Sequence, residues 1–360
     1  MNMLRRVSIA RLLIGCAVTV LAGISLTALA LALGSGPTPP AKPLAQAVHD
    51  ALSAPRPQGF SAEVQFTDHL LDGAQLASGE GEEGTGGSLA TSPLLSGASG
   101  RMWVSAAGEV RIELQAEKGD TQIVYDGSEL ELYDASSNTL YRLKAPREES
   151  SATDQPSGSP PTLGEVEHAL AHLSEHARVS AAEPADIGGR PAYEVKLSPQ
   201  QGGSLFAGVS LAFDADNGVP LRAAVYSTQS SSPVLELTTS SISYGPVAES
   251  VFQIQPPADA KVEEVQIPHE HANKESAEKD HGQLTIHGHG PTAIAVLEQR
   301  QHGSQSSLPA GLPHVKLGSV TATELQSELG TLLTFERAGI RYLVLGSLEP
   351  GPIEAFARGL

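Results

Sequence analysis

The stretch QIVYDGSELELYDASSNTLYRLK, residues 122–144, decides the fold class of the chain. Two runs rich in β-branched, aromatic and aliphatic residues flank Asp126 and Gly127, a dipeptide that supplies the positive φ angles of a tight hairpin turn. Residues 134–138 have the composition of a second turn, and residues 139–144 that of a third strand. The stretch therefore predicts an antiparallel meander.

The second of these strands predicts the environment of the sheet. Leu130 and Leu132 alternate with Glu129 and Glu131, so one face is apolar and the other acidic, as in a sheet that is solvated on one side. The two glutamates are also the residue types of an acid–base pair, but alternating charges on a solvated face explain them more simply. We therefore expect no catalysis at this position.

Length and composition exclude several classes of protein. The 360 residues suffice for two domains and for a core that needs no disulfide. Cys16 is the only cysteine, so no intramolecular disulfide can form. The formal charge of -18 argues against a nucleic-acid partner, because phosphate binding requires concentrated Lys and Arg.

An uncharged segment near the N-terminus predicts the location of the protein. Arg5, Arg6 and Arg11 precede residues 12–33, which are long enough to span a bilayer as a helix. We expect this segment to be a single-pass anchor in the cell membrane, with the bulk of the chain extracytoplasmic. A cleaved signal peptide is the alternative, because residues 28–30 have the small-x-small pattern of a cleavage site.

The rest of the chain divides by composition into four parts. Residues 34–43 form a Pro-rich extended tether. Residues 44–257 form a large domain, and residues 258–282 form a charged linker rich in histidine. Residues 283–360 form a small α+β domain.

Periodic patterns predict two amphipathic helices and an antiparallel sheet in the large domain. Thr162 caps the second helix, and Glu165 completes a capping box. Residues 73–100 are rich in Gly and acidic residues and predict a disordered or mobile loop. The expected helices are residues 44–54 and 163–173, and the expected strands are residues 59–66, four or five strands within 102–143, and residues 191–197, 209–213, 221–228 and 234–244.

The small domain shows patterns of both kinds. Strands are expected at residues 284–287 and 293–298, and a hairpin over residues 331–345 around Ala338-Gly339. Residues 321–329 and 349–358 are expected to be helices.

Two groups of residues suggest chemistry, but neither predicts a site. Five histidines include two His-x-His pairs, yet they lack a Cys or carboxylate frame at the usual spacing, so we expect no metal and no cofactor. They are His269, His271, His281, His287 and His289. Ser210 lies in GVSLA, which lacks the final Gly of a nucleophile elbow and falls in an expected strand. The protein is not expected to be an enzyme.

Four motifs follow one another in the large domain: DGSELELYDASSNTLYRL, GRPAYEVKLSP, GVSLAFDADNGVPLRAAVYS and VFQIQPP. Their order resembles the lipoprotein-carrier (LolA-like) family and the related sigma-factor regulators of the MucB/RseB type. The resemblance implies an α+β fold, in which helices form a lid over a strongly curved, incomplete antiparallel β-barrel. Its apolar concavity would hold lipid or the acyl chains of lipoproteins.

Alternation along the expected strands assigns residues to this cavity, and spacings of three or four along the second expected helix assign residues to its lid. The cavity residues are Phe60, Val64, Phe66, Ile112, Leu114, Leu130, Leu132, Tyr193, Val195, Val209, Leu211, Phe213, Leu221 and Val225. The lid residues are Leu163, Val166, Leu170 and Leu173.

The sequence thus leaves two functions open. The first is a membrane-tethered, extracytoplasmic protein that binds lipid or lipoprotein acyl chains without catalysis. The second is an envelope-sensing module that regulates a membrane signalling protein, which it would contact through the C-terminal domain.

N-terminal sequencing of the mature protein tests the anchor. If residues 12–33 are retained as a membrane span, the mature chain begins before residue 12 and stays in the membrane fraction. A start near Leu31 or Gly34 would show instead that the segment is a cleaved signal.

Overall fold

The structure is a computed structural model and describes residues 38–71, 97–116, 119–144, 160–265, 283–300 and 312–360. Within these residues, no helix is both long enough and apolar enough to cross a membrane. The expected anchor, residues 12–33, lies outside the described residues, as does most of the expected loop over residues 73–100.

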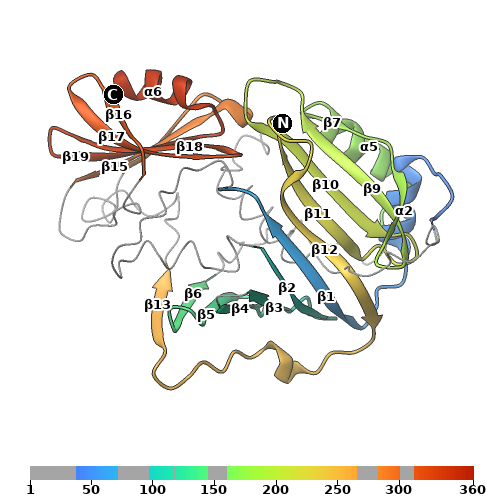
Figure 1. Cartoon of the computed structure of the whole chain (residues 1–360). Helices are drawn as coiled ribbons and strands as arrows, with labels where there is room; N and C mark the ends of the chain where they lie inside the picture. The colour runs from blue at the N-terminus through green and yellow to red at the C-terminus, as the bar shows by residue number, and fades with distance from the viewer. Residues whose placement is uncertain (1–37, 72–96, 117–118, 145–159, 266–282, 301–311) are drawn as a thin grey trace, which may run out of the picture.

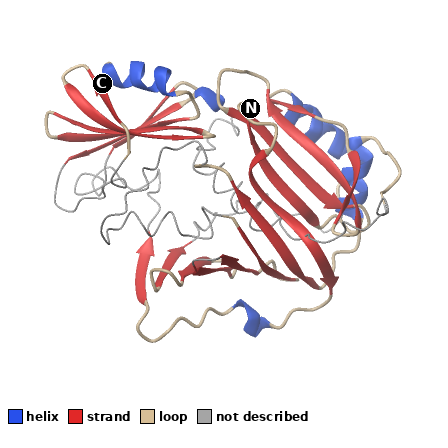
Figure 2. Ribbon diagram, in the orientation of Figure 1, coloured by secondary structure: helices blue, strands red, loops and turns tan. Residues whose placement is uncertain are grey.

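The described chain is mostly β-structure and forms two separate open sheets (Figures 1 and 2). The first sheet has 13 strands. Twelve of them follow the order β13-β6-β5-β4-β3-β2-β1-β12-β11-β10-β9-β7, and β8 pairs with β9 outside this path. Its strands are β1 (Gly59–Asp68), β2 (Ala98–Ser105), β3 (Val110–Ala116), β4 (Gly119–Tyr125), β5 (Glu129–Asp134), β6 (Thr139–Lys144), β7 (Ala177–Val179), β8 (Glu183–Ile187), β9 (Arg190–Pro199), β10 (Phe206–Asp214), β11 (Pro220–Ser227), β12 (Pro233–Tyr244) and β13 (Lys261–Val265).

The predicted meander is confirmed as strands β4, β5 and β6. Gly127 has a φ of 93°, and Asn138 in the second turn has a φ of 48°, so both turns use the left-handed conformations that Gly and Asn tolerate. The Asp126 carboxylate accepts hydrogen bonds from the backbone N–H groups of Ser128 and Glu129, which closes the first turn.

The sheet bends between its two halves, so that β2–β6 lie steeply inclined to β9–β12 (Figure 1). Strands β1 and β12 join the halves, and their register shifts between Glu63 and Val64, which leaves Ser240 unpaired as a β-bulge. A bulge increases the local twist and bends the strand that carries it. The bend therefore coincides with the pair of strands that connects the two halves.

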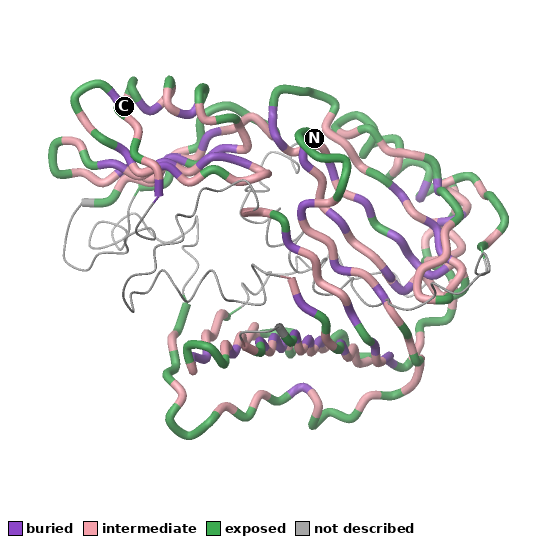
Figure 3. The backbone as a smooth tube through the Cα atoms, viewed as in Figure 1, coloured by how far each residue is buried: buried purple, intermediate pink, exposed green. Residues whose placement is uncertain are grey.

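A continuous apolar core lies against β1–β4 and reaches β9, β11 and β12. Buried and less buried residues alternate along many strands, as Figure 3 shows. The largest of the core side chains with almost no exposure include Met102, Ile112 and Leu221.

Both helices predicted in the large domain are present, as α2 (Leu44–Ser53) and α5 (Leu163–Ser174). The Thr162 side chain accepts the Glu165 N–H, and the Glu165 carboxylate accepts the Thr162 N–H, so the predicted capping box is formed. Helix α2 buries Ala47 in a second cluster, together with Tyr193, Val195 and Phe213 of the sheet.

The C-terminal sheet has six antiparallel strands in the order β14-β15-β19-β18-β17-β16, with helix α6 on one face. Its elements are β14 (Gln283–His287), β15 (Ile294–Arg300), β16 (His314–Leu317), β17 (Val320–Ser327), β18 (Gly330–Arg337), β19 (Ile340–Gly346) and α6 (Pro350–Arg358). Two backbone hydrogen bonds tie it to the first sheet, from Leu205 N to Ser347 O and from Glu328 N to Leu70 O.

Two predictions for this part of the chain are wrong. Residues 321–329 are not a helix: they form most of β17, in which Ala322 and Glu324 alternate with more exposed residues as strand pairing requires. Residues 261–265 belong to the first sheet as β13, which pairs in parallel with β6, although their composition predicted a linker.

Phe213 and Leu211 lie two residues apart on one strand and differ in burial, with exposures of 8% and 37%. Phe213→Ala should lower the free energy of unfolding by about 3 to 5 kcal/mol, because it removes a ring packed against Tyr193 and helix α2. Leu211→Ala is the matched control and should cost less than about 1.5 kcal/mol, because much of its surface is already solvated. Urea unfolding of both variants measures the difference, and equal losses would contradict the assignment of these two residues.

Candidate functional site

The candidate ligand-binding surface is an apolar row that crosses five neighbouring strands. Direct pairing places Val195 of β9 opposite Leu211 of β10, Leu211 opposite Ala223 of β11, Ala223 opposite Leu237 of β12, and Leu237 opposite Phe66 of β1. Directly paired residues share one face of a sheet. All five therefore face the same side.

A second row runs beside the first. It joins Leu197, Val209, Val225 and Leu235 by direct pairing on four of the same strands, β9 to β12. All four residues are half-buried. We call the two rows together the apolar stripe.

The most exposed member of the stripe is Leu211, the second of the five residues in the first row. Val195 and Leu237 are buried, whereas Leu211, which lies between them on β10, is 37% exposed. Strand β10 is interior to the sheet, with β9 and β11 on its two sides, so this exposure does not come from a sheet edge. Together with the half-buried apolar residues around it, Leu211 makes this face a candidate site for an apolar ligand.

The opposite face of the same strands carries a paired polar network. Arg222 donates from Nε to Glu236 and from Nη1 to Glu194 and Ser210, with N···O distances of 2.5, 2.8 and 3.2 Å. Burial alone would lower the pKa of Arg222, but Glu236 and the hydroxyl of Tyr226 raise it above the usual value. The network therefore joins β9, β10, β11 and β12 on the face that the stripe does not use.

The same network includes Ser210, the serine considered from the sequence as a nucleophile. Ser210 is buried, and its Oγ accepts a hydrogen bond from Arg222 rather than lying next to a base. Its position within β10 is also not a strand-to-helix turn, which the nucleophile elbow requires.

A buried carboxylate holds the turn at the start of β11. Asp214 is fully buried and accepts hydrogen bonds from Arg190 Nε and the Tyr244 hydroxyl, both at 2.7 Å. The Arg190 guanidinium also lies 5.3 Å from the centroid of the Tyr244 ring. Burial and the bond to Asp214 raise the pKa of Tyr244, so its hydroxyl remains a donor at neutral pH. The three side chains act as a structural lock between β9, β10 and β12.

The structure distributes the predicted cavity residues over three environments. Those in the large core, or packed against it, are Phe60, Val64, Phe66, Ile112, Leu114, Leu130, Leu132 and Leu221. Those in the cluster beneath α2 are Tyr193, Val195 and Phe213. Those that belong only to the apolar stripe are Val209, Leu211 and Val225. Sequence reasoning missed three members of the stripe, which are Leu197, Leu235 and Leu237.

The predicted lid residues are not equally covered. Val166 is buried, Leu163 and Leu170 are half-buried, and Leu173 is 37% exposed. Helix α5 packs beside α2 and β7 (Figure 1), which places it at the β9 end of the stripe.

The C-terminal sheet carries a second apolar row. Ile286 of β14 pairs with Ala295, Ala295 with Leu345, Leu345 with Leu332, and Leu332 with Leu325, so the row crosses five strands on one face. Helix α6 packs on the other face. Leu345 is 50% exposed and Ile286 is 43% exposed. We call this row the C-terminal face.

Within the described residues, one group has three metal-ligating side chains close together: His172, Glu175 and His176 at the end of α5. Of the histidines considered from the sequence, His287 packs its ring 5.0 Å from that of Phe356. The predicted histidines 269, 271 and 281 lie outside the described residues.

No protein-family model matches the sequence. No curated protein matches it either. Among solved structures, the MucA/MucB complex from Pseudomonas aeruginosa is 15% identical with a TM-score of 0.43, and the match covers 87% of this chain and 96% of that chain. A LolA superfamily protein from Nitrosomonas europaea is 11% identical with a TM-score of 0.20, over 87% of this chain and 97% of that chain.

An uncharacterized conserved protein from Thermus thermophilus is 15% identical with a TM-score of 0.34, over 62% of this chain and 97% of that chain. The two families that the sequence motifs resemble thus recur among the structural neighbours. TM-scores below 0.5 leave this likeness at the level of a resemblance.

Proposed function

We propose that the protein is an extracytoplasmic binding protein that holds lipid or lipoprotein acyl chains on the apolar stripe, without catalysis. The observation that carries the proposal is the exposed Leu211 on an interior strand, second from the β9 end of a row of five apolar residues. In this proposal residues 12–33 tether the chain to the cell membrane, and helix α5 is part of a lid over a strongly curved half-barrel.

The dimensions of the stripe suit an acyl chain. The first row crosses five neighbouring strands, which are separated by four gaps of about 4.8 Å, so this row is about 19 Å long. One leaflet of a bilayer holds its acyl chains over a depth of about 15 Å, half of the hydrocarbon thickness. An extended acyl chain therefore fits along the row.

The chemistry of the stripe also suits an apolar ligand. All nine of its members are aliphatic or aromatic, so the stripe offers no hydrogen-bonding side chain. Each CH₂ group that leaves water on this surface gains about 0.8 kcal/mol. Binding by burial alone requires no catalytic group. The charged residues on the opposite face of these strands are paired with one another.

Leu211→Glu tests this proposal through the binding of a fluorescent fatty-acyl probe. The variant should weaken binding by at least about tenfold, because binding would desolvate a carboxylate against the acyl chain. The loss of stability should stay below about 1.5 kcal/mol, as for Leu211→Ala, since part of the Leu211 surface is already solvated. The matched control is Val262→Glu, an exposed apolar position at the far edge of the same sheet, which should bind the probe as the parent does. Absence of binding in the parent, or equal binding by both variants, would reject the stripe as the ligand site.

The C-terminal face favours a second candidate function, regulation of a membrane signalling protein. An apolar row with Leu345 half exposed in an interior strand fits an apolar segment of a protein partner. A membrane tether would hold the protein beside such a partner at a high effective concentration. Two of the solved MucB structures contain MucA, but the support here is the exposed row of this chain.

Native intact-mass analysis of the protein extracted from membranes tests the second function beside the first. Leu345→Glu should remove a protein adduct and leave a lipid adduct in place, because it places a charge on the C-terminal face only. Leu211→Glu should do the reverse, and each variant serves as the control for the other. A protein adduct that survives Leu345→Glu would contradict the C-terminal face as the contact surface.

A further inference from the structure

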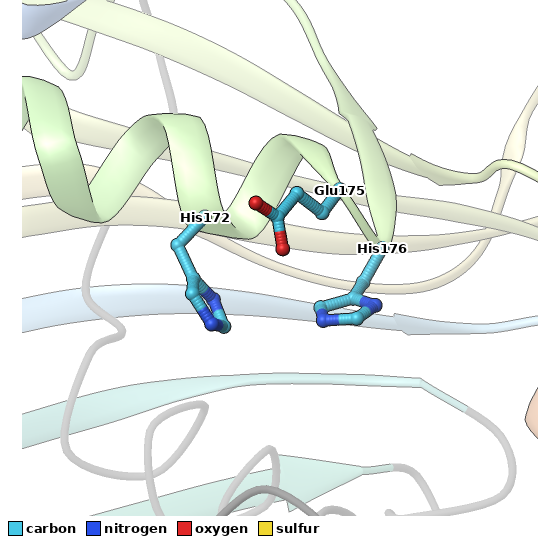
Figure 4. A group of neighbouring side chains, drawn as sticks. All are labelled: His172, Glu175 and His176. Carbon is cyan, nitrogen blue, oxygen red and sulfur yellow. The ribbon is translucent and has the colours of Figure 1, made fainter. Parts of the chain in front are cut away.

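Three side chains with metal-ligating atoms converge at the C-terminal end of helix α5. The ligand atoms of His172, Glu175 and His176 all lie within 4.8 Å of one another. The two imidazole rings are 5.5 Å apart between centroids and inclined by 63°. Figure 4 shows both rings on the same side of the helix end, with the Glu175 carboxylate between them.

The backbone fixes the spacing of these side chains. His172 and His176 are four residues apart, the separation that places two side chains on one face of a helix. The helix ends at Ser174, but Glu175 still has αR dihedrals, and the N–H groups of Glu175 and His176 donate to the carbonyl groups of His172 and Leu173, respectively. The helical geometry therefore continues to the third ligand position.

The chemistry of this group matches a divalent transition metal ion. Imidazole nitrogen and carboxylate oxygen are ordinary ligands of zinc, and imidazole also suits copper and nickel. A tetrahedral ion with bonds of about 2.1 Å separates neighbouring ligand atoms by about 3.4 Å. All three side chains are exposed, so a rotation of each closes the remaining gap without disturbing the core.

The electrostatic environment also favours a cation. The last turn of a helix carries a partial negative charge, because its carbonyl groups lack intrahelical partners. Glu175 adds a full negative charge at the same point, and the chain as a whole has a formal charge of -18. A bound ion would thus be stabilised by its ligands and by the helix end.

We propose that His172, Glu175 and His176 bind zinc or another divalent transition metal ion, and that the ion fixes the end of helix α5 against β7. Strand β7 begins at Ala177, directly after His176, and pairs with β9 through Val179 and Leu197. The Ser174 carbonyl accepts a hydrogen bond from Gln200 Nε2. Metal binding therefore stabilises the lid where it meets the apolar stripe, whether or not the stripe binds lipid.

The chain offers a matched control on the same helix. His168 lies one turn before His172 and is also exposed, but it does not belong to the three-ligand group. The control matters because the chain has 12 histidines, and several outside the described residues compete for added metal. The measurement must therefore report on the end of α5 itself.

Amide hydrogen exchange on the full chain, with and without zinc, gives such a local measurement. At a zinc concentration about 100 times the Kd, exchange of backbone amides in residues 173–179 should slow by about a hundredfold, because opening must release the ion. His168→Ala should retain this protection. His172→Ala combined with His176→Ala should abolish it, and Glu175→Gln should weaken zinc affinity by at least about tenfold, since even the loss of an outer-shell partner has a comparable effect.

Three results would overturn the proposal. The first is unchanged exchange in residues 173–179 of the parent with zinc present. The second is protection that survives the double histidine variant, which would assign the metal to other histidines. The third is equal protection by magnesium, which prefers oxygen ligands and would indicate only screening of the acidic surface.

Discussion

The large sheet depends on the pairing of two strands that are far apart in the sequence, β1 and β12. Phe60 pairs with Tyr244 and Asp68 with Leu235, so the whole intervening chain closes into one loop before this ladder can form. Every other strand of the sheet attaches to one side of this pair, β2–β6 and β13 beyond β1, and β7–β11 beyond β12. The bulge at Ser240 bends the sheet at the same place, so pairing and curvature have a common origin.

Local structure was predictable where short-range chemistry decides it. The Asp126-Gly127 hairpin and the Thr162 capping box form as their residues predict, because each depends on hydrogen bonds within a few residues. Residues 320–327 show the limit of periodicity: a short segment with Leu325 and several good helix formers forms β17, because both neighbouring strands supply ladder partners. Strand β13 was missed for a related reason, since it pairs with β6, which lies more than a hundred residues earlier in the chain.

The sequence predicted that residues of the apolar stripe share one face of the sheet, but not which of them are exposed. Alternation correctly placed Leu211 and Phe213 on the same side of one strand. It does not show that helix α2 packs on Phe213 while Leu211 stays open, because that difference depends on where a distant helix docks. The spacing of His172, Glu175 and His176 was visible in the sequence, yet only the continuation of helical geometry past Ser174 shows that the three side chains converge.

The return of the chain from β12 to β13 has a mechanical consequence. Residues 245–260 run beneath β2–β5 to the far edge of the sheet (Figure 1), and the Arg111 guanidinium donates hydrogen bonds to the carbonyl groups of Val251 and Gln253. Tension exerted through the C-terminal unit first breaks its two backbone hydrogen bonds to Leu205 and Leu70, and it then loads the ladder between β13 and β6 at the edge of the sheet. Tension from the N-terminal side enters instead through α2 and β1 at the centre. A protein stretched between a membrane and a partner would therefore yield at β13 while the central pair of strands, and the apolar stripe beside it, remained intact.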